Sequence, residues 1–111
     1  MEITVQQHKH CSLLGVEGKV DSYTAPELTK TIEAENRDGH YKIVIDFTKL
    51  TYMSSAGFRA LLVGQRNCKR YNRGEIVLAA VPKNIMDALE LTGFTPLFKV
   101  FNDITSAVGS F

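Results

Sequence analysis

Two adjacent serines, Ser54 and Ser55, have the type and setting that chemistry would need. They follow the apolar run Ile43-Val44-Ile45 and open a segment with helical periodicity. A loop between a strand and the next helix lies at the carboxyl end of the strand, where open α/β sheets place their sites. The small residues Ala56 and Gly57 leave a neighbouring hydroxyl accessible to another protein. The serines can therefore cap the helix, act as a nucleophile or accept a phosphate, and residue types alone leave these alternatives open.

A nucleophilic serine hydrolase is the enzymatic alternative. Its strand-turn-helix elbow reads G-x-S-x-G, and neither serine has a glycine two residues before it. His8, His10 and His40 all precede the serines, whereas that fold has its histidine last. Catalysis needs a base within hydrogen-bond reach of the nucleophile. We therefore expect no catalytic residues and no enzyme activity.

The sequence also lacks patterns for metals and cofactors. His8 and His10 would share one face of an extended strand, next to Cys11, but a zinc site needs a third or fourth ligand at a specific spacing. The chain contains neither G-x-G-x-x-G nor G-x-x-x-x-G-K-[ST], the phosphate-binding patterns. We expect surface histidines, no metal site and no cofactor.

Composition narrows the class of protein further. The 111 residues suit one domain, 1–111, and 13 basic against 12 acidic side chains give no broad footprint for nucleic acid. Lys69, Arg70 and Arg73 cluster where a helix should end, and there they complement the helix dipole. No apolar stretch is long enough for membrane insertion, and Cys11 and Cys68 are not in C-x-x-C spacing. A cytoplasmic protein with reduced thiols is expected.

Strand and helix patterns alternate along the chain. Polar residues between the first two strands predict an antiparallel hairpin. Thr24-Ala25-Pro26-Glu27 is a capping-box pattern that predicts a helix start, with the Thr24 hydroxyl accepting from the Glu27 N–H. Residues 49–53 are expected to form a loop. The predicted strands cover residues 2–6, 12–17, 41–47, 75–80 and 97–101, and the predicted helices cover 25–38, 55–71, 82–91 and 103–108.

This order predicts an α/β sandwich: a mixed, mainly parallel β-sheet with an opening hairpin, flanked by about four α-helices. Residues 21–23 and the Ser54 loop both precede helices at the same end of the sheet, so we expect them to lie near each other.

Three segments in this order resemble the STAS domain, named for sulfate transporters and anti-sigma factor antagonists, and specifically its stand-alone bacterial antagonists. The resemblance covers essentially the whole chain. The segments are Gly18-Lys19-Val20-Asp21 with Thr24-Ala25, Asp46-Phe47 with Tyr52-Met53-Ser54-Ser55-Ala56-Gly57-Phe58, and Leu91-Thr92-Gly93-Phe94 with Phe98.

The resemblance implies a phosphorylation site. The family's common motif is M-D-S-[ST]-G, and its first serine accepts the phosphate. Aligned on Met53 and Gly57, that serine corresponds to Ser55, while Ser54 takes the place of the acidic residue. Ser54 is the alternative acceptor.

The resemblance also implies a function, partner switching. The unphosphorylated antagonist binds an anti-sigma factor serine kinase with a GHKL-type ATPase fold, phosphorylation releases it, and a PP2C-type phosphatase restores it. The alternative is a non-phosphorylated STAS subunit of a lipid-transport or sensory complex. The expected partner-binding residues are Asp21, Ser22, Tyr23, Ser54, Gly57, Phe58 and Arg59.

Overall fold

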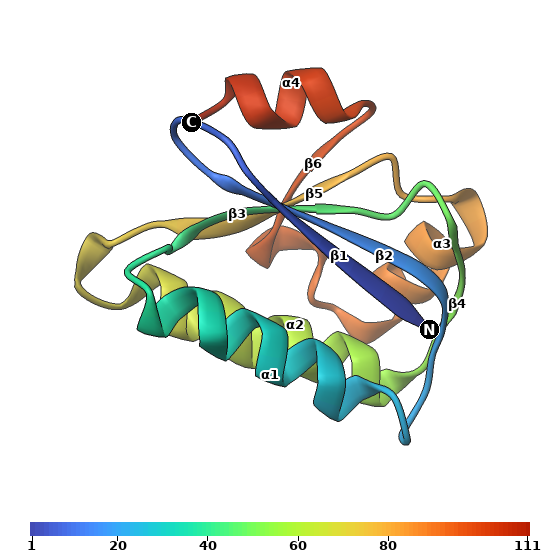
Figure 1. Ribbon diagram of the computed structural model, residues 1–111. Helices are drawn as coiled ribbons and strands as arrows, with labels where there is room; N and C mark the ends of the chain where they lie inside the picture. The colour runs from blue at the N-terminus through green and yellow to red at the C-terminus, as the bar shows by residue number, and fades with distance from the viewer.

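The computed structural model describes residues 1–111 and contains one six-stranded sheet with four α-helices (Figure 1). The main path of the sheet runs β1-β2-β3-β5-β6, and β4 pairs with β2 beside this path. The strands are β1 (Glu2–Gln7), β2 (Ser12–Val20), β3 (Lys42–Asp46), β4 (Leu50–Met53), β5 (Glu75–Ala79) and β6 (Lys99–Phe101). The helices are α1 (Ala25–Arg37), α2 (Ser55–Lys69), α3 (Lys83–Thr92) and α4 (Ile104–Gly109).

Strand pairing confirms the predicted mixed, mainly parallel sheet. β1 and β2 form the antiparallel hairpin, in register from Glu2 opposite Glu17 to Gln7 opposite Ser12. Every other pair is parallel: β2 with β3, β2 with β4, β3 with β5 and β5 with β6. The carboxyl ends of the parallel strands therefore share one edge of the sheet.

Helices cover both faces of the sheet, which explains the continuous apolar runs in β3 and β5. In Figure 1, α1, α2 and α3 lie on one side and α4 on the other. Ile43 and Ile45 point into the large core beneath α1 to α3, whereas Val44 packs in the smaller core with Ala107 of α4. Alternate residues of β3 thus bury on opposite faces, as strand geometry requires.

Three expected boundaries are wrong. Residues 50–53 form β4 rather than a loop. The reason is that β2 extends to Val20, and its last three residues, from Gly18 onward, pair with β4 instead of with β3. The last strand is shorter than the expected range 97–101 and begins at Lys99, because Thr95–Leu97 form a 3-10 turn that contains Pro96. Helix α2 ends at Lys69, and a 3-10 turn over Arg70–Asn72 follows it.

The expected capping box is also wrong, although α1 begins at Ala25 as predicted. The Thr24 hydroxyl faces backwards, where it accepts from the Asp21 N–H at 2.8 Å. The Glu27 N–H donates to the Thr24 backbone carbonyl at 3.0 Å instead. Asp21, rather than Thr24, organises the turn into α1.

Gln65 interrupts the apolar face of α2 for a structural reason. It is 4% exposed, and its Nε2 donates to the Ile76 carbonyl at 3.1 Å and the Leu97 carbonyl at 2.7 Å. Its Oε1 accepts from the Ile76 N–H at 2.6 Å. β6 pairs with β5 only from Val77 onward, so the N–H and carbonyl of Ile76 have no hydrogen-bond partner in β6. The Gln65 side chain supplies both partners. No helix of the structure is both long enough and apolar enough to span a membrane.

Candidate functional site: a serine corner at the ends of β2 and β4

The end of β2 lies against the end of β4, and this pairing forms the corner that carries Ser55. Val20 stands opposite Met53 in the parallel register, and the Ser54 N–H donates to the Val20 carbonyl at 2.8 Å. The next residues of each strand turn into α1 and α2. The expected closeness of residues 21–23 to the Ser54 loop is thereby confirmed. We call residues 21–23 and 54–59 together the serine corner.

The two serines of the corner differ in accessibility. Ser54 has the backbone conformation of an N-cap residue, with φ −81° and ψ 172°, but its side chain makes no capping hydrogen bond. Its Oγ is buried and has no hydrogen-bond partner. Ser55 is the first residue of α2 and is exposed. Another protein can therefore reach the Ser55 hydroxyl without moving the backbone.

Gly57 and Phe58 support the corner from inside. A Cβ on Gly57 would lie 2.6 Å from Met53 Cγ and 2.9 Å from Val20 Cγ1, so only glycine lets the first turn of α2 pack this closely. Phe58 is 3% exposed and belongs to the main core. Both residues position Ser55, and neither offers a side chain to a partner.

Asp21 holds the neighbouring loop in shape. Its Oδ1 accepts from the Tyr23 N–H at 2.9 Å, the Thr24 N–H at 3.1 Å and the Thr24 hydroxyl at 3.2 Å. These hydrogen bonds, the backbone N–H groups of Thr24 and Tyr23 first, lower the pKa of the Asp21 carboxyl below its usual value. The ionised carboxylate fixes a turn that leaves Ser22 exposed and the Tyr23 side chain 91% exposed.

Tyr52 belongs to this surface, and the sequence analysis missed it. It lies on β4, in register with Lys19 of β2, and is 49% exposed one residue before the buried Met53. Treating residues 50–53 as a loop hid the signal. Adjacent strand residues point to opposite faces, so a strand that ends at the buried Met53 would have pointed Tyr52 outward.

The histidines lie at the opposite edge of the sheet from the serine corner. His8, His10 and His40 line a shallow pocket of about 370 Å³ with Cys11, where β2 begins rather than where it ends. His8 and His10 are exposed, as expected of surface histidines. A serine at the corner therefore has no histidine beside it to act as a general base.

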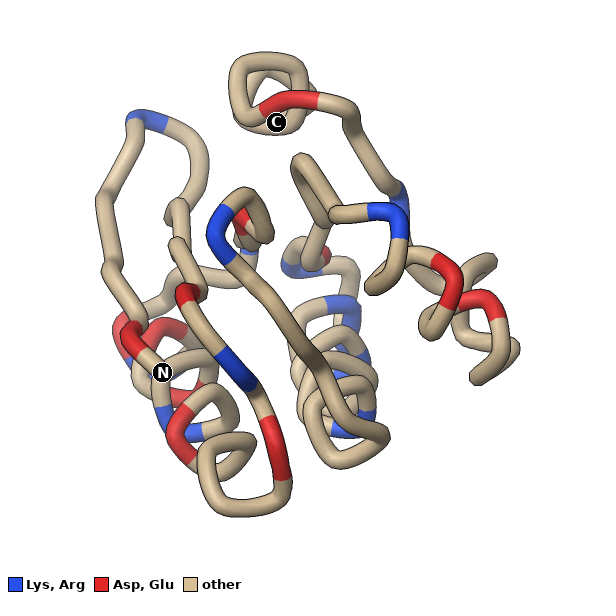
Figure 2. The backbone as a smooth tube through the Cα atoms, turned by 90° about the vertical axis from the view of Figure 1, so that its right-hand side faces the viewer, with Lys and Arg blue, Asp and Glu red and all other residues tan.

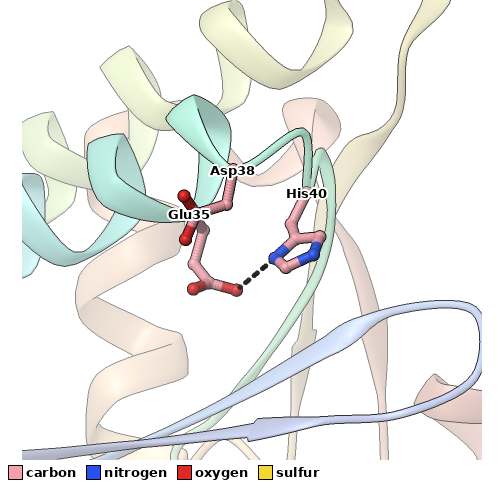
Figure 3. Close-up of side chains that lie close together, drawn as sticks. All are labelled: Glu35, Asp38 and His40. Atoms are coloured by element: carbon pink, nitrogen blue, oxygen red, sulfur yellow. Dashed lines mark hydrogen bonds and ion pairs between the residues drawn. The ribbon is translucent and has the colours of Figure 1, made fainter.

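Glu35, Asp38 and His40 form a cluster at that same far edge, which the sequence analysis did not find (Figure 3). Their ligand atoms lie within 4.8 Å of one another, close enough for a metal ion. Glu35 Oε1, however, accepts from Gln7 Nε2 at 2.8 Å and lies 3.3 Å from His40 Nδ1. The carboxylate thus ties α1 to the opening hairpin, and this contact accounts for its burial.

The balance at Glu35 favours the ionised carboxylate. Burial is the largest influence and raises its pKa, but hydrogen bonds from Ser12 and Gln7, with the charge and hydrogen bond of His40, outweigh it. The pKa of Glu35 is lowered overall.

Of the basic cluster expected at the end of α2, Arg73 acts on the helix terminus. Arg73 donates from Nη2 to the Asn67 carbonyl at 2.8 Å and from Nε to the Arg70 carbonyl at 3.0 Å. Its guanidinium also stacks 3.9 Å from the centre of the Tyr41 ring. Side chains that satisfy the last carbonyls of a helix stabilise its end.

Comparison with known proteins agrees with this architecture. The profile of the STAS domain family matches residues 2–107. The chain belongs to the STAS domain family. BtrV of Bordetella bronchiseptica, which is named as an anti-sigma factor antagonist, is 28% identical over 111 residues, covering 100% of this STAS chain and 95% of BtrV. The anti-sigma-B factor antagonist of Staphylococcus aureus is 32% identical over 85 residues, covering 77% of this chain and 78% of that protein.

Solved structures share the STAS fold found here. The Bacillus anti-sigma factor antagonist SpoIIAA in its unphosphorylated form superposes with a TM-score of 0.82 at 14% identity, over 96% of this chain and 93% of that chain. Its phosphorylated form superposes with a TM-score of 0.76 at 14% identity, over 98% of both chains.

Proposed function

We propose that this STAS chain is a cytoplasmic, single-domain anti-sigma factor antagonist that works by partner switching. Unphosphorylated, it binds an anti-sigma factor serine kinase of the GHKL type through the serine corner. Phosphorylation of Ser55 releases it, and a PP2C-type phosphatase restores binding. The observation that carries the proposal is the exposed hydroxyl of Ser55 on the first residue of α2, beside the exposed Tyr23 loop.

The chemistry of the transfer belongs to the partner. The Ser55 Oγ forms a bond to the γ-phosphorus of ATP while the bond from that phosphorus to the bridging oxygen breaks, and ADP leaves. A base of the kinase takes the hydroxyl proton, because the three histidines of this chain gather at the far edge of the sheet. The chain is thus a substrate and a ligand, not an enzyme.

The physical effect of the phosphate suits a switch. A phosphoserine carries about −1.5 to −2 charges. A charge that is buried in an interface without a partner costs about 3 to 5 kcal/mol. Each ~1.4 kcal/mol changes the affinity of the complex tenfold. The folded STAS chain itself tolerates the charge, since Ser55 is exposed and the N-terminus of a helix favours an anion by about 0.3 to 1 kcal/mol. Phosphorylation would therefore abolish the complex without unfolding the antagonist.

The test is incubation with the cognate kinase and ATP, followed by phosphopeptide mapping. The wild-type chain should gain one phosphate, on Ser55. Ser55→Ala should lose labelling but still bind the kinase, since it removes only an exposed hydroxyl. Ser55→Asp should bind more weakly, although one carboxylate carries less charge than a phosphate.

Ser54→Ala is the matched control. It removes a hydroxyl one residue away whose oxygen has no hydrogen-bond partner, so folding and labelling should persist. A phosphate on Ser54 would show that the alignment on Met53 and Gly57 is wrong. If neither serine is labelled and a transporter ATPase co-purifies in place of a kinase, the chain is the non-phosphorylated subunit described above.

A further inference from the structure

Arg59 is an exposed cation of the serine corner whose charge nothing in the structure neutralises. The three ion pairs join His40 to Glu35, Lys83 to Asp87 and Lys99 to Glu75, so none involves Arg59. Helix α2 carries Arg59, Arg66 and Lys69 but no acidic residue (Figure 2). Its own helix therefore supplies no partner for the guanidinium.

Spacing puts Arg59 within reach of Ser55. The two residues are four positions apart on α2, and side chains at i and i+4 are neighbours, with Cβ atoms about 5 to 6 Å apart. An anion that precedes a cation at this spacing is the favourable orientation, because it also agrees with the helix dipole. An exposed phosphate on Ser55 and the Arg59 guanidinium can therefore meet without a change of backbone.

The surroundings leave that phosphate with no competing cation on the same turn and with one nearby anion. The first-turn N–H groups of α2 receive no side-chain cap from Ser54, and the first turn has no acidic residue. Asp21 lies next to Ser54 across the Val20–Met53 pair, and its Oδ1 accepts from the N–H groups of its own loop. None of the ion pairs joins Asp21 to Arg59, and the charge of Asp21 would oppose a phosphate that stood alone.

We infer that Arg59 is the cation that binds the phosphate of phosphorylated Ser55 within the same chain, an inference that rests on the proposed function. The phosphate then changes the serine corner in two ways. It adds negative charge at Ser55, and it occupies the one guanidinium of the corner that was free to meet an acidic group of a partner. Bidentate hydrogen bonding suits arginine for this contact, because its planar fork matches phosphate oxygens.

The test is a phosphorus NMR titration of the intact chain with phosphoserine inserted at position 55 during translation, so that no kinase is needed. An ordinary phosphoserine loses its second proton at pH about 6. The midpoint of the wild-type chain should lie lower than that of Arg59→Gln by about 0.15 to 0.4 pH unit, the size expected when loss of the second proton adds one negative charge beside an exposed i, i+4 cation. Arg59→Lys keeps the charge and should retain part of this shift.

Arg66→Gln is the control, because it removes the same charge from an exposed position of the same helix. Arg66 is eleven residues from Ser55, about 16 Å along the axis and beyond the screening length of about 8 Å at physiological salt. The titration midpoint of Arg66→Gln should equal that of the wild type. Circular dichroism should show that all variants are folded. The inference is overturned if Arg59→Gln titrates like the wild type, or if Arg66→Gln shifts as far. Failure of a kinase to label Ser55 would instead count against the proposed function, since the phosphate of this titration does not come from a kinase.

Discussion

Replacing Gln65 with leucine should destabilise the fold far more than the loss of a polar side chain usually does. The amide makes two buried hydrogen bonds, to the N–H and carbonyl of Ile76, and a partly buried one to the carbonyl of Leu97. Leucine has a similar size and can fill the space, so the cavity term is small. The change therefore isolates the polar contacts between α2 and the end of β5 that β6 does not reach.

The magnitude follows from counting those contacts. Each net hydrogen bond contributes about 0.5 to 1.5 kcal/mol, and an N–H left buried without a partner costs about 1 to 3 kcal/mol. Better burial of the leucine side chain offsets about 1.5 to 3 kcal/mol of the total. We expect the free energy of unfolding to fall by about 3 kcal/mol, which for a domain of this size lowers the melting temperature by about 10 to 15 °C.

Urea denaturation at constant pH measures this directly, with the midpoint falling and the slope unchanged. Gln6→Leu makes the same substitution at an exposed position of β1 and should stay within about 0.5 kcal/mol of the wild type. If Gln65→Leu matched Gln6→Leu, the Ile76 backbone would have another partner in the folded protein. In that case Gln65 of α2 would not substitute for a longer β6.

Two further predictions concern titratable groups. The pKa of Glu35 in the folded protein lies below its ordinary value of 4.5, so the contribution of this carboxylate to stability is complete above pH 4.5 and is lost as the pH falls through the lowered pKa. The urea midpoint should therefore drop on acidification below pH 4.5. In Glu35→Gln the midpoint should drop less steeply. Cys11 and Cys68 are buried free thiols, and burial raises the pKa of each. The thiols of the native protein should therefore react slowly, and thiol titration of the denatured, unreduced protein should find two groups. Finding no thiol in the denatured protein would contradict the expectation that both are reduced.

Periodicity predicted most of the fold, and it failed where tertiary pairing overrides local pattern. The alternation in β1 marks the side on which the partly buried Ile3 packs against the core, although Val5 stays exposed. The apolar run in β3 reflects burial on both faces, so in each case a sequence window contains the signal. β4 has only four residues, with its buried positions at the two ends and exposed ones between, and no window of that length distinguishes it from a loop. It exists because β2 extends past β3, which local sequence does not encode.

The candidate site was predicted in part for a similar reason. The place of the serine pair, at the carboxyl edge before a helix, followed from the order of elements. Residue types left Ser54 and Ser55 equivalent, and only the folded structure distinguishes them, because it buries the Ser54 oxygen and leaves Ser55 exposed. Which serine a kinase labels stays a prediction.

The two ends of the chain lie at opposite edges of the sheet, and this affects how the protein can be handled. Met1 contacts the bend at Gly18, two residues before Val20, so the amino terminus lies beside the serine corner (Figure 1). Phe111 lines a hollow with Lys42 and Gly74, where β3 and β5 begin. An affinity tag or fluorophore fused to Met1 would stand where the proposed kinase approaches and would mask that interaction. The same tag after Phe111 would leave that approach open.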